Sequence, residues 1–133
     1  FLIAALLIVG GSRLLKSAMV VDIESAEISA VLSAEAMSQE FRNNEDIYRK
    51  KYDNLVLQIE GIVSETGNDF ETGAYFALKG LNNDPFGIKC YFLEQNIADA
   101  NKVKIGDKVI MKGVANGNKL ENCKVINING QSL

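Results

Sequence analysis

The stretch 54–64, NLVLQIEGIVS, constrains the fold most, because its side chains show the clearest strand periodicity in the chain. Every second residue from Leu55 to Ile59 is apolar, which is the two-residue period of a half-buried strand. Gly61 then interrupts the run before it resumes. A glycine inside a strand is typical of a bulge or a sharp bend. We therefore expect one long strand, bent at Gly61, that serves two sides of a small barrel.

The pattern after residue 64 predicts four more strands and a short helix. A polar loop is expected over 65–73, strands over 73–80, 86–92, 109–115 and 120–128, and a helix over 93–101. Five strands with a helix between the third and the fourth have the order of an OB-fold, a small, partly open barrel. A five-stranded SH3-like barrel, the main competitor, lacks a helix at that position. The predicted class is therefore mainly β with helices, in OB-fold order.

The first 21 residues form a hydrophobic segment. Residues 1–11 are continuously apolar, and Arg13 is the first charged residue. A membrane-spanning helix needs about 20 apolar residues, and only about a dozen precede the first charge. We therefore interpret 1–21 as the distal part of an uncleaved membrane anchor. A signal-peptide hydrophobic region and a buried core helix are the alternatives. By the positive-inside rule, Arg13 and Lys16 favour a cytoplasmic location for the C-terminal side of the anchor, although residues upstream of Phe1 could reverse that orientation.

A connector and an amphipathic helix are expected between the anchor and the first strand. The acidic stretch 22–32 suits a connector, and the domain is expected to span 33–133. Ser33 is a typical N-cap for a helix over 34–50, in which Met37, Phe41 and Tyr48 form one apolar stripe. This helix could pack on the barrel or dock a partner protein, in which case the chain would be a structural subunit.

Composition excludes several classes of chemistry. The chain has no histidine, which removes the commonest general base and the commonest metal ligand. Its 14 basic and 17 acidic side chains give a formal charge of -3, so no overall positive field attracts nucleic acid. The acidic residues do not have the spacing of a calcium loop. We expect no enzyme activity, no catalytic residue, no cofactor and no metal.

The solvent face of the strands expected over 73–80 and 86–92 is the predicted ligand site. OB-folds bind nucleic acids and sugars on this face, which here would present Tyr75, Lys79, Lys89 and Tyr91. Two aromatic rings can stack on bases while lysines meet phosphates. The same residues are also ordinary occupants of an exposed strand, and the acidic charge disfavours nucleic acid. An oligosaccharide or a peptide would tolerate that charge better.

The two cysteines fall on strands that become neighbours when an OB barrel closes. Cys90 and Cys123 both alternate into the apolar face of their strands. In an oxidising compartment a disulfide between them would stabilise the fold by about 3 to 4 kcal/mol in the loop-entropy model. Two buried free thiols are the alternative.

Short motifs along the chain resemble those of one family. They are Asn44-Glu45, Lys51-Tyr52, Glu60-Gly61-Ile62-Val63, Ile88-Lys89-Cys90-Tyr91-Phe92, Ile105-Gly106-Asp107-Lys108-Val109 and Leu120-Glu121-Asn122-Cys123. Over about 33–128 the chain is similar to the tRNA-anticodon-binding-like OB family. The resemblance implies a signal or membrane anchor and an extracytoplasmic, periplasmic domain, and it carries over no catalytic residue. The resulting hypothesis is a non-catalytic, membrane-tethered binding module whose ligand the sequence does not identify.

Overall fold

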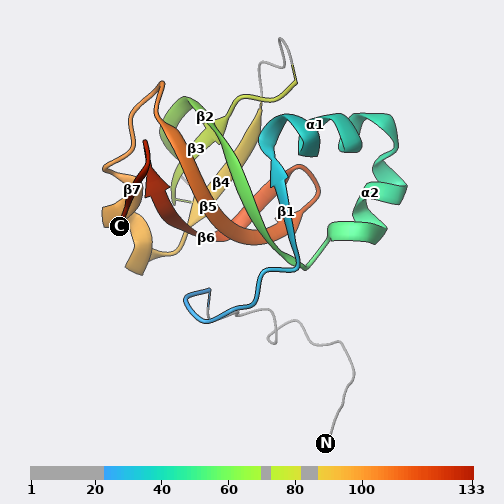
Figure 1. Cartoon of the computed structure of the whole chain (residues 1–133), viewed down its shortest axis with the longest axis horizontal. Helices are drawn as coiled ribbons and strands as arrows, with labels where there is room; N and C mark the ends of the chain where they lie inside the picture. The colour runs from blue at the N-terminus through green and yellow to red at the C-terminus, as the bar shows by residue number, and fades with distance from the viewer. Residues whose placement is uncertain (1–22, 70–72, 82–86) are drawn as a thin grey trace, which may run out of the picture.

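One long strand organises the structure, a computed structural model that describes residues 23–69, 73–81 and 87–133 (Figure 1). The first half of β2 (Val56–Asp69) pairs antiparallel with β5 (Lys108–Asn116). Its second half pairs antiparallel with β3 (Gly73–Leu78). The prediction of a single strand that serves two sides of a barrel is confirmed.

The remaining strands close the barrel. Strand β4 (Ile88–Phe92) pairs antiparallel with β3 and parallel with β6 (Lys119–Ile128), which pairs in turn with β5. Two short helical segments, η2 (Glu94–Asn96) and α3 (Ile97–Ala100), lie between β4 and β5. In the part of the chain that the structure describes, five strands thus form a barrel with the helical insertion of an OB-fold, as predicted. The short strand β7 (Gln131–Ser132) extends the sheet beside β6.

The irregularity in β2 lies beyond the predicted position. The pairing between β2 and β3 shifts register between Val63 and Glu65 and not at Gly61. Gly61 is needed for another reason, because a Cβ atom there would lie 2.9 Å from the Cβ of Ala34 and 3.2 Å from Leu78. The glycine therefore provides space for the first turn of a helix that packs on the barrel.

The hairpin between β2 and β3 is longer than the sequence suggested. Residues 65–69, expected as the start of a loop, continue β2, with Thr66 opposite Phe76 and Asp69 opposite Gly73. Residues 65–68 are exposed, so they lack the apolar alternation that identifies a half-buried strand. Strand pairing across the hairpin decides their conformation.

The N-terminal part of the domain contains a strand and two helices. Strand β1 (Ala30–Ser33), which begins within the stretch expected to be a connector, pairs parallel with β2. The single helix expected over 34–50 is instead α1 (Ala34–Asn43) followed by α2 (Glu45–Tyr52). Asn44 ends the first helix and caps the second, because its side-chain oxygen accepts a hydrogen bond from the backbone N–H of Ile47 at 3.1 Å. An asparagine side chain competes in this way with continuous helix.

The predicted cap and the predicted apolar stripe are both present. The backbone N–H of Ala36 donates to the Ser33 hydroxyl at 3.0 Å. Met37 and Tyr48 are buried in the barrel core cluster, and the rings of Phe41 and Tyr48 meet edge to face at 5.3 Å. The stripe therefore packs on the barrel, with Met37 and Tyr48 buried and Phe41 partly buried.

Several expectations concern residues outside the described part of the chain. These are the membrane anchor over 1–21, residues 70–72 of the expected loop and residue 86 of the strand expected over 86–92. Among the residues that are described, no helix has both the length and the apolar character needed to cross a membrane.

Candidate functional site

Two tyrosines meet on the outer face of β3 and β4. Tyr75 and Tyr91 are directly opposite each other in the antiparallel register, and opposite residues in such a pair project from the same face of the sheet. Their ring centroids are 5.7 Å apart with the ring planes 44° apart. Both residues are half-buried, so each ring keeps a surface that a ligand can contact.

The neighbouring strand holds the ring of Tyr75 in place. Its hydroxyl donates a hydrogen bond to the Glu65 carboxylate at 3.0 Å. Gly67 is opposite Tyr75 in the hairpin, and a Cβ atom at residue 67 would lie 2.7 to 2.8 Å from the tyrosine ring and hydroxyl. The ring therefore covers the backbone of this glycine, a contact that stabilises glycine in strands. The sequence did not indicate this support, because Glu65 and Gly67 were predicted to lie in a loop.

Two lysines flank the tyrosine pair. The ammonium of Lys89 lies 5.1 Å from the ring centroid of Tyr75, within the range of a cation–π contact. The parallel pairing of β4 with β6 places Lys119 beside Lys89. Lys119 also lines a hollow of about 230 Å³ together with Tyr91, Phe92, Leu93, Glu121 and Asn122. Lys119 was not predicted as a site residue, because only the closure of the barrel brings the start of β6 next to β4.

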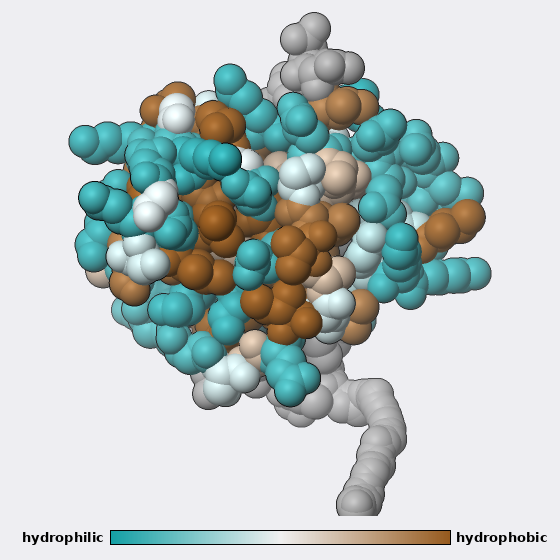
Figure 2. Space-filling model, viewed as in Figure 1, coloured by the Kyte–Doolittle hydropathy of each residue, from teal (hydrophilic) through white to brown (hydrophobic). Residues whose placement is uncertain are grey.

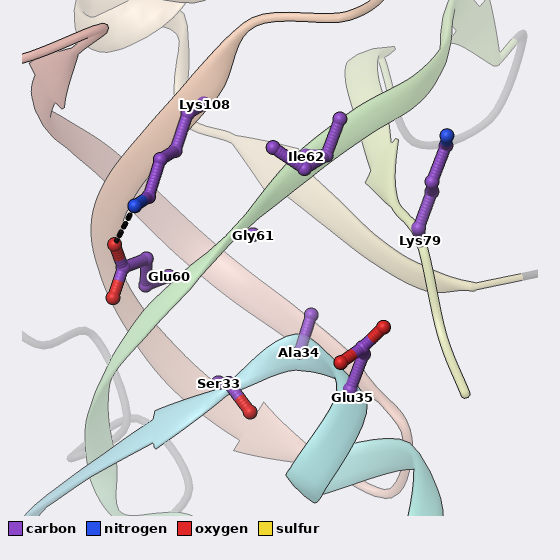
Figure 3. Close-up of a pocket in the computed structure, with 8 residues that line it drawn as sticks. All are labelled: Ser33, Ala34, Glu35, Glu60, Gly61, Ile62, Lys79 and Lys108. Carbon is purple, nitrogen blue, oxygen red and sulfur yellow. Dashed lines mark ion pairs between the residues drawn. The ribbon is translucent and has the colours of Figure 1, made fainter. Parts of the chain in front are cut away.

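Lys79, the fourth predicted site residue, belongs to a different hollow. It follows β3 and lines a space of about 350 Å³ at the N-terminus of α1 (Figure 3). The other lining residues are Ser33, Ala34, Glu35, Glu60, Gly61, Ile62 and Lys108. Figure 3 shows Lys108 in an ion pair with Glu60 at 3.0 Å, while the Lys79 side chain extends away from Glu35. The observed cluster is therefore Tyr75, Lys89, Tyr91 and Lys119, which we call the tyrosine–lysine face.

The tyrosine–lysine face offers groups that can contact a ligand. Its side chains supply aromatic rings, ammonium groups and hydrogen-bond acceptors, but no paired nucleophile and base. Within residues 23–69, 73–81 and 87–133, no group of three or more Cys, Asp and Glu side chains is arranged to hold a metal ion. The chemistry that the face offers is stacking on planar rings and attraction of anionic groups.

The two cysteines lie in the core on neighbouring strands. Phe92 of β4 is paired with Cys123 of β6, and Cys90 with Leu120. Both thiols are free and fully buried. Burial raises the pKa of the Cys123 thiol well above its ordinary value, and the hydrogen-bonded Cys90 thiol beside it raises that pKa further. Gly113 leaves room for the pair, since a Cβ atom there would lie 2.8 Å from the Cys123 sulfur. The disulfide stays a prediction.

Burial of both thiols, together with the raised pKa of Cys123, predicts slow reaction in the folded protein, because a reagent must reach the sulfur and the thiolate is the reactive form. We expect Ellman's reagent at pH 8 to modify neither thiol of the reduced, folded chain within minutes and to modify two per chain in guanidinium chloride. Protein isolated without reductant from an oxidising compartment would give no signal in guanidinium chloride if the disulfide forms. Rapid modification of the folded, reduced protein would contradict the buried arrangement.

Comparisons with known proteins give a family match and a structural match. The profile of the family described as tRNA_anti-like matches residues 1–129. A crystal structure from Klebsiella pneumoniae subsp. pneumoniae MGH 78578, described as that of a "putative nucleic acid-binding lipoprotein", is similar with a TM-score of 0.59 and 19% identity. The match covers 79% of this chain and 95% of that chain. At this identity the likeness shows the fold. No curated protein matches the sequence.

Proposed function

The chain belongs to the tRNA_anti-like family, and from that premise we propose that it is a non-catalytic OB-fold binding module tethered to a membrane. In this proposal residues 1–21 are the tether and the barrel lies on the extracytoplasmic, periplasmic side. The apolar sequence of residues 1–11 and the description of the similar Klebsiella protein as a lipoprotein support the tether. Protease protection of the full chain in sealed cells and spheroplasts tests on which side of the membrane the barrel lies.

The observation that carries the binding function is the pair of half-buried rings, Tyr75 and Tyr91, with their centroids 5.7 Å apart on the outer face of the barrel. Exposed aromatic rings on strands of an OB-fold are stacking platforms for bases. Glu65 and Gly67 hold one of these rings in advance of any ligand. Because the ring is ordered beforehand, less conformational entropy is lost on binding.

Single-stranded nucleic acid is the ligand class that we propose for this face. The side chains of Lys89 and Lys119 belong to neighbouring strands, where their ammonium groups can meet the phosphates of a strand whose bases stack on the tyrosines. The similar Klebsiella protein is described as a putative nucleic acid-binding protein, which favours this class. The formal charge of -3 limits the electrostatic contribution, so we expect weak binding with a small salt dependence. An oligosaccharide is the alternative ligand.

Binding of a fluorescein-labelled oligothymidylate, followed by anisotropy, tests the proposal. Each of Tyr75→Ala and Tyr91→Ala is expected to weaken binding by about 1 to 3 kcal/mol, the worth of one base stack, whereas Tyr75→Phe keeps the ring and most of the affinity. Lys119→Ala is expected to reduce the slope of log K against log salt by about 1. Lys79→Ala is the matched control and leaves both quantities unchanged, because Lys79 lies in the other hollow.

Two results would contradict the nucleic-acid proposal. Binding that both tyrosine-to-alanine variants retain would place the ligand elsewhere. If the oligothymidylate fails to bind while a chitin or peptidoglycan oligosaccharide binds and loses affinity in Tyr91→Ala, the face is a binding site for sugar rings. Either result leaves the membrane tether to be judged separately.

A further inference from the structure

The segment that leads from the proposed tether to the barrel is fastened to the outer surface of the sheet. We call residues 23–29 the strap. Ile23 is buried against Val56 of β2 and Val114 of β5, in a small cluster separate from the barrel core. At its other end, the backbone N–H of Ser29 donates to the carbonyl of Val56 at 2.8 Å. The strap therefore begins and ends in contact with the same strand, β2.

A buried lysine fixes the middle of the strap. Lys112 of β5 is only 8% exposed, and its ammonium donates to the carbonyls of Glu24 and Ala26, both at 3.3 Å. The Glu24 carboxylate forms an ion pair with Lys124 of β6 at 3.1 Å. A lysine is rarely buried unless its charge is compensated. The strap supplies this compensation through the two carbonyls, so Lys112 has these hydrogen bonds only while the strap is docked.

Exposed apolar side chains lie in the strap and beside it. The large hydrophobic residues Ile28, Val31 and Leu55 are 39%, 64% and 40% exposed. Ile28 is the last residue but one of the strap. Leu55 comes directly before Val56, whose carbonyl accepts the hydrogen bond from Ser29, and Val31 lies opposite Gln58 on β2. Figure 2 shows hydrophobic residues gathered over the middle of one face of the molecule. The carboxylates of Glu60 and Glu24 are paired with Lys108 and Lys124.

We propose that the strap and the apolar residues Ile28, Val31 and Leu55 rest on the surface of a lipid bilayer. The inference relies on the proposed tether over 1–21. Since Ile23 is fixed to the barrel, two residue steps of at most about 7 Å separate it from residue 21, and 12 steps of at most about 43 Å separate it from residue 11, where the continuous apolar run ends. The tether therefore keeps the barrel near the membrane, and its apolar side chains near the strap gain by entering the headgroup region. We propose a zwitterionic bilayer, because an anionic one would repel the exposed Glu27 carboxylate of the strap.

The absence of tryptophan from the chain makes a direct test possible. Val31→Trp places one reporter beside the strap, and Ile47→Trp places a control on α2, at a residue with a similar exposure of 62%. Each full-length variant is incorporated into phosphatidylcholine vesicles with brominated acyl chains, which quench tryptophan at short range. We expect at least twofold quenching of Val31→Trp, with a blue-shifted emission, and little quenching of Ile47→Trp.

The outcomes of this experiment separate the proposed tether from the proposed membrane contact. If the full chain floats with the vesicles and the two reporters are quenched equally little, the tether holds and the membrane-contact inference is wrong. If the chain does not float, the tether fails and the inference fails with it. A blue shift of Val31→Trp without lipid that grows with protein concentration would show that a second copy covers this surface, which also overturns the inference.

Release of the strap supplies a second test. Lys112→Met keeps the length of the side chain but cannot donate to Glu24 and Ala26, and Lys102→Met is the control at an exposed lysine. In the Val31→Trp background, Lys112→Met is expected to at least halve the quenching while the chain still floats, because the barrel can then move away. Unchanged quenching in a folded Lys112→Met protein would show that the strap does not hold the barrel at the bilayer.

Discussion

Replacement of Gly61 by valine is expected to lower the free energy of unfolding by about 3 kcal/mol, the upper end of the cost of overpacking a core. The first atom added would lie 2.9 Å from the Cβ of Ala34 and 3.2 Å from two side-chain atoms of Leu78. Ala34 begins α1 and Leu78 ends β3, and both are buried. Neither a short alanine side chain nor the core leucine can move aside without displacing its own element. Urea denaturation measures the loss.

A double substitution tests whether the cost arises from this contact. Gly61→Ala alone is expected to destabilise the protein by about 1 to 2 kcal/mol through the clash with Ala34. In an Ala34→Gly background the same change has room, so the two effects should be coupled by about 1 kcal/mol. Additive effects would show that the cost does not arise from the contact with Ala34.

The hydroxyl of Tyr48 is expected to destabilise the protein at high pH. The side chain is 1% exposed, and within the described residues its hydroxyl has no hydrogen-bond partner. Burial raises the pKa of Tyr48 above its ordinary value of 10.0, and the nearby Asp53 carboxylate raises it further. Above pH 10 the unfolded chain therefore loses the proton while the folded protein keeps it, which favours unfolding.

The expected result is a loss of about 1.4 kcal/mol in the free energy of unfolding for each pH unit above about 10, up to the raised pKa of the folded state. Tyr48→Phe removes this contribution, so its stability relative to the original protein should rise steadily between about pH 10 and 12. At neutral pH the same change should cost little, since no hydrogen bond is lost. Denaturant titrations at a series of pH values measure the difference.

Tyr52→Phe is the matched control for this experiment. The Tyr52 hydroxyl lies 3.1 to 3.2 Å from the two carboxylate oxygens of Glu40, so removal of this hydroxyl should lower the free energy of unfolding by about 1 kcal/mol at neutral pH. A Tyr48→Phe protein that is equally destabilised at neutral pH would show that the Tyr48 hydroxyl has a partner. Parallel pH profiles for Tyr48→Phe and the original protein would contradict the raised pKa.

The order of the barrel strands was predictable because each strand carries its own periodicity. The alternation of Ile88, Cys90 and Phe92 with Lys89 and Tyr91 is reproduced in the burial of β4, and the helical segment comes after it as expected. Periodicity failed where an element does not bury one face. The exposed residues 65–68 have the pattern of a loop but continue β2, and β1 begins in a stretch with the composition of a connector.

Three of the four residues of the candidate site, Tyr75, Lys89 and Tyr91, could be predicted from local pattern, and Lys119 could not. Tyr75 and Tyr91 were predicted to share a face, and the antiparallel register of β3 and β4 brings them together. Lys79 was expected beside them, but it comes after the last residue of β3 and lines the hollow beside α1. Lys119 takes its place in the cluster through a parallel pairing with Lys89, which is distant in the sequence, and no local pattern indicates that pairing.

The sequence by itself determined the barrel class, the capped helix start at Ser33 and the two aromatic residues of the face, because each depends on neighbours a few positions away in the chain. Only the tertiary structure decided the role of Gly61, the support of Tyr75 by Gly67, the neighbourhood of Lys119 and the fastening of the strap by Lys112. These features arise where distant segments come into contact, and the free energy of such contacts depends on distances that a linear pattern does not contain.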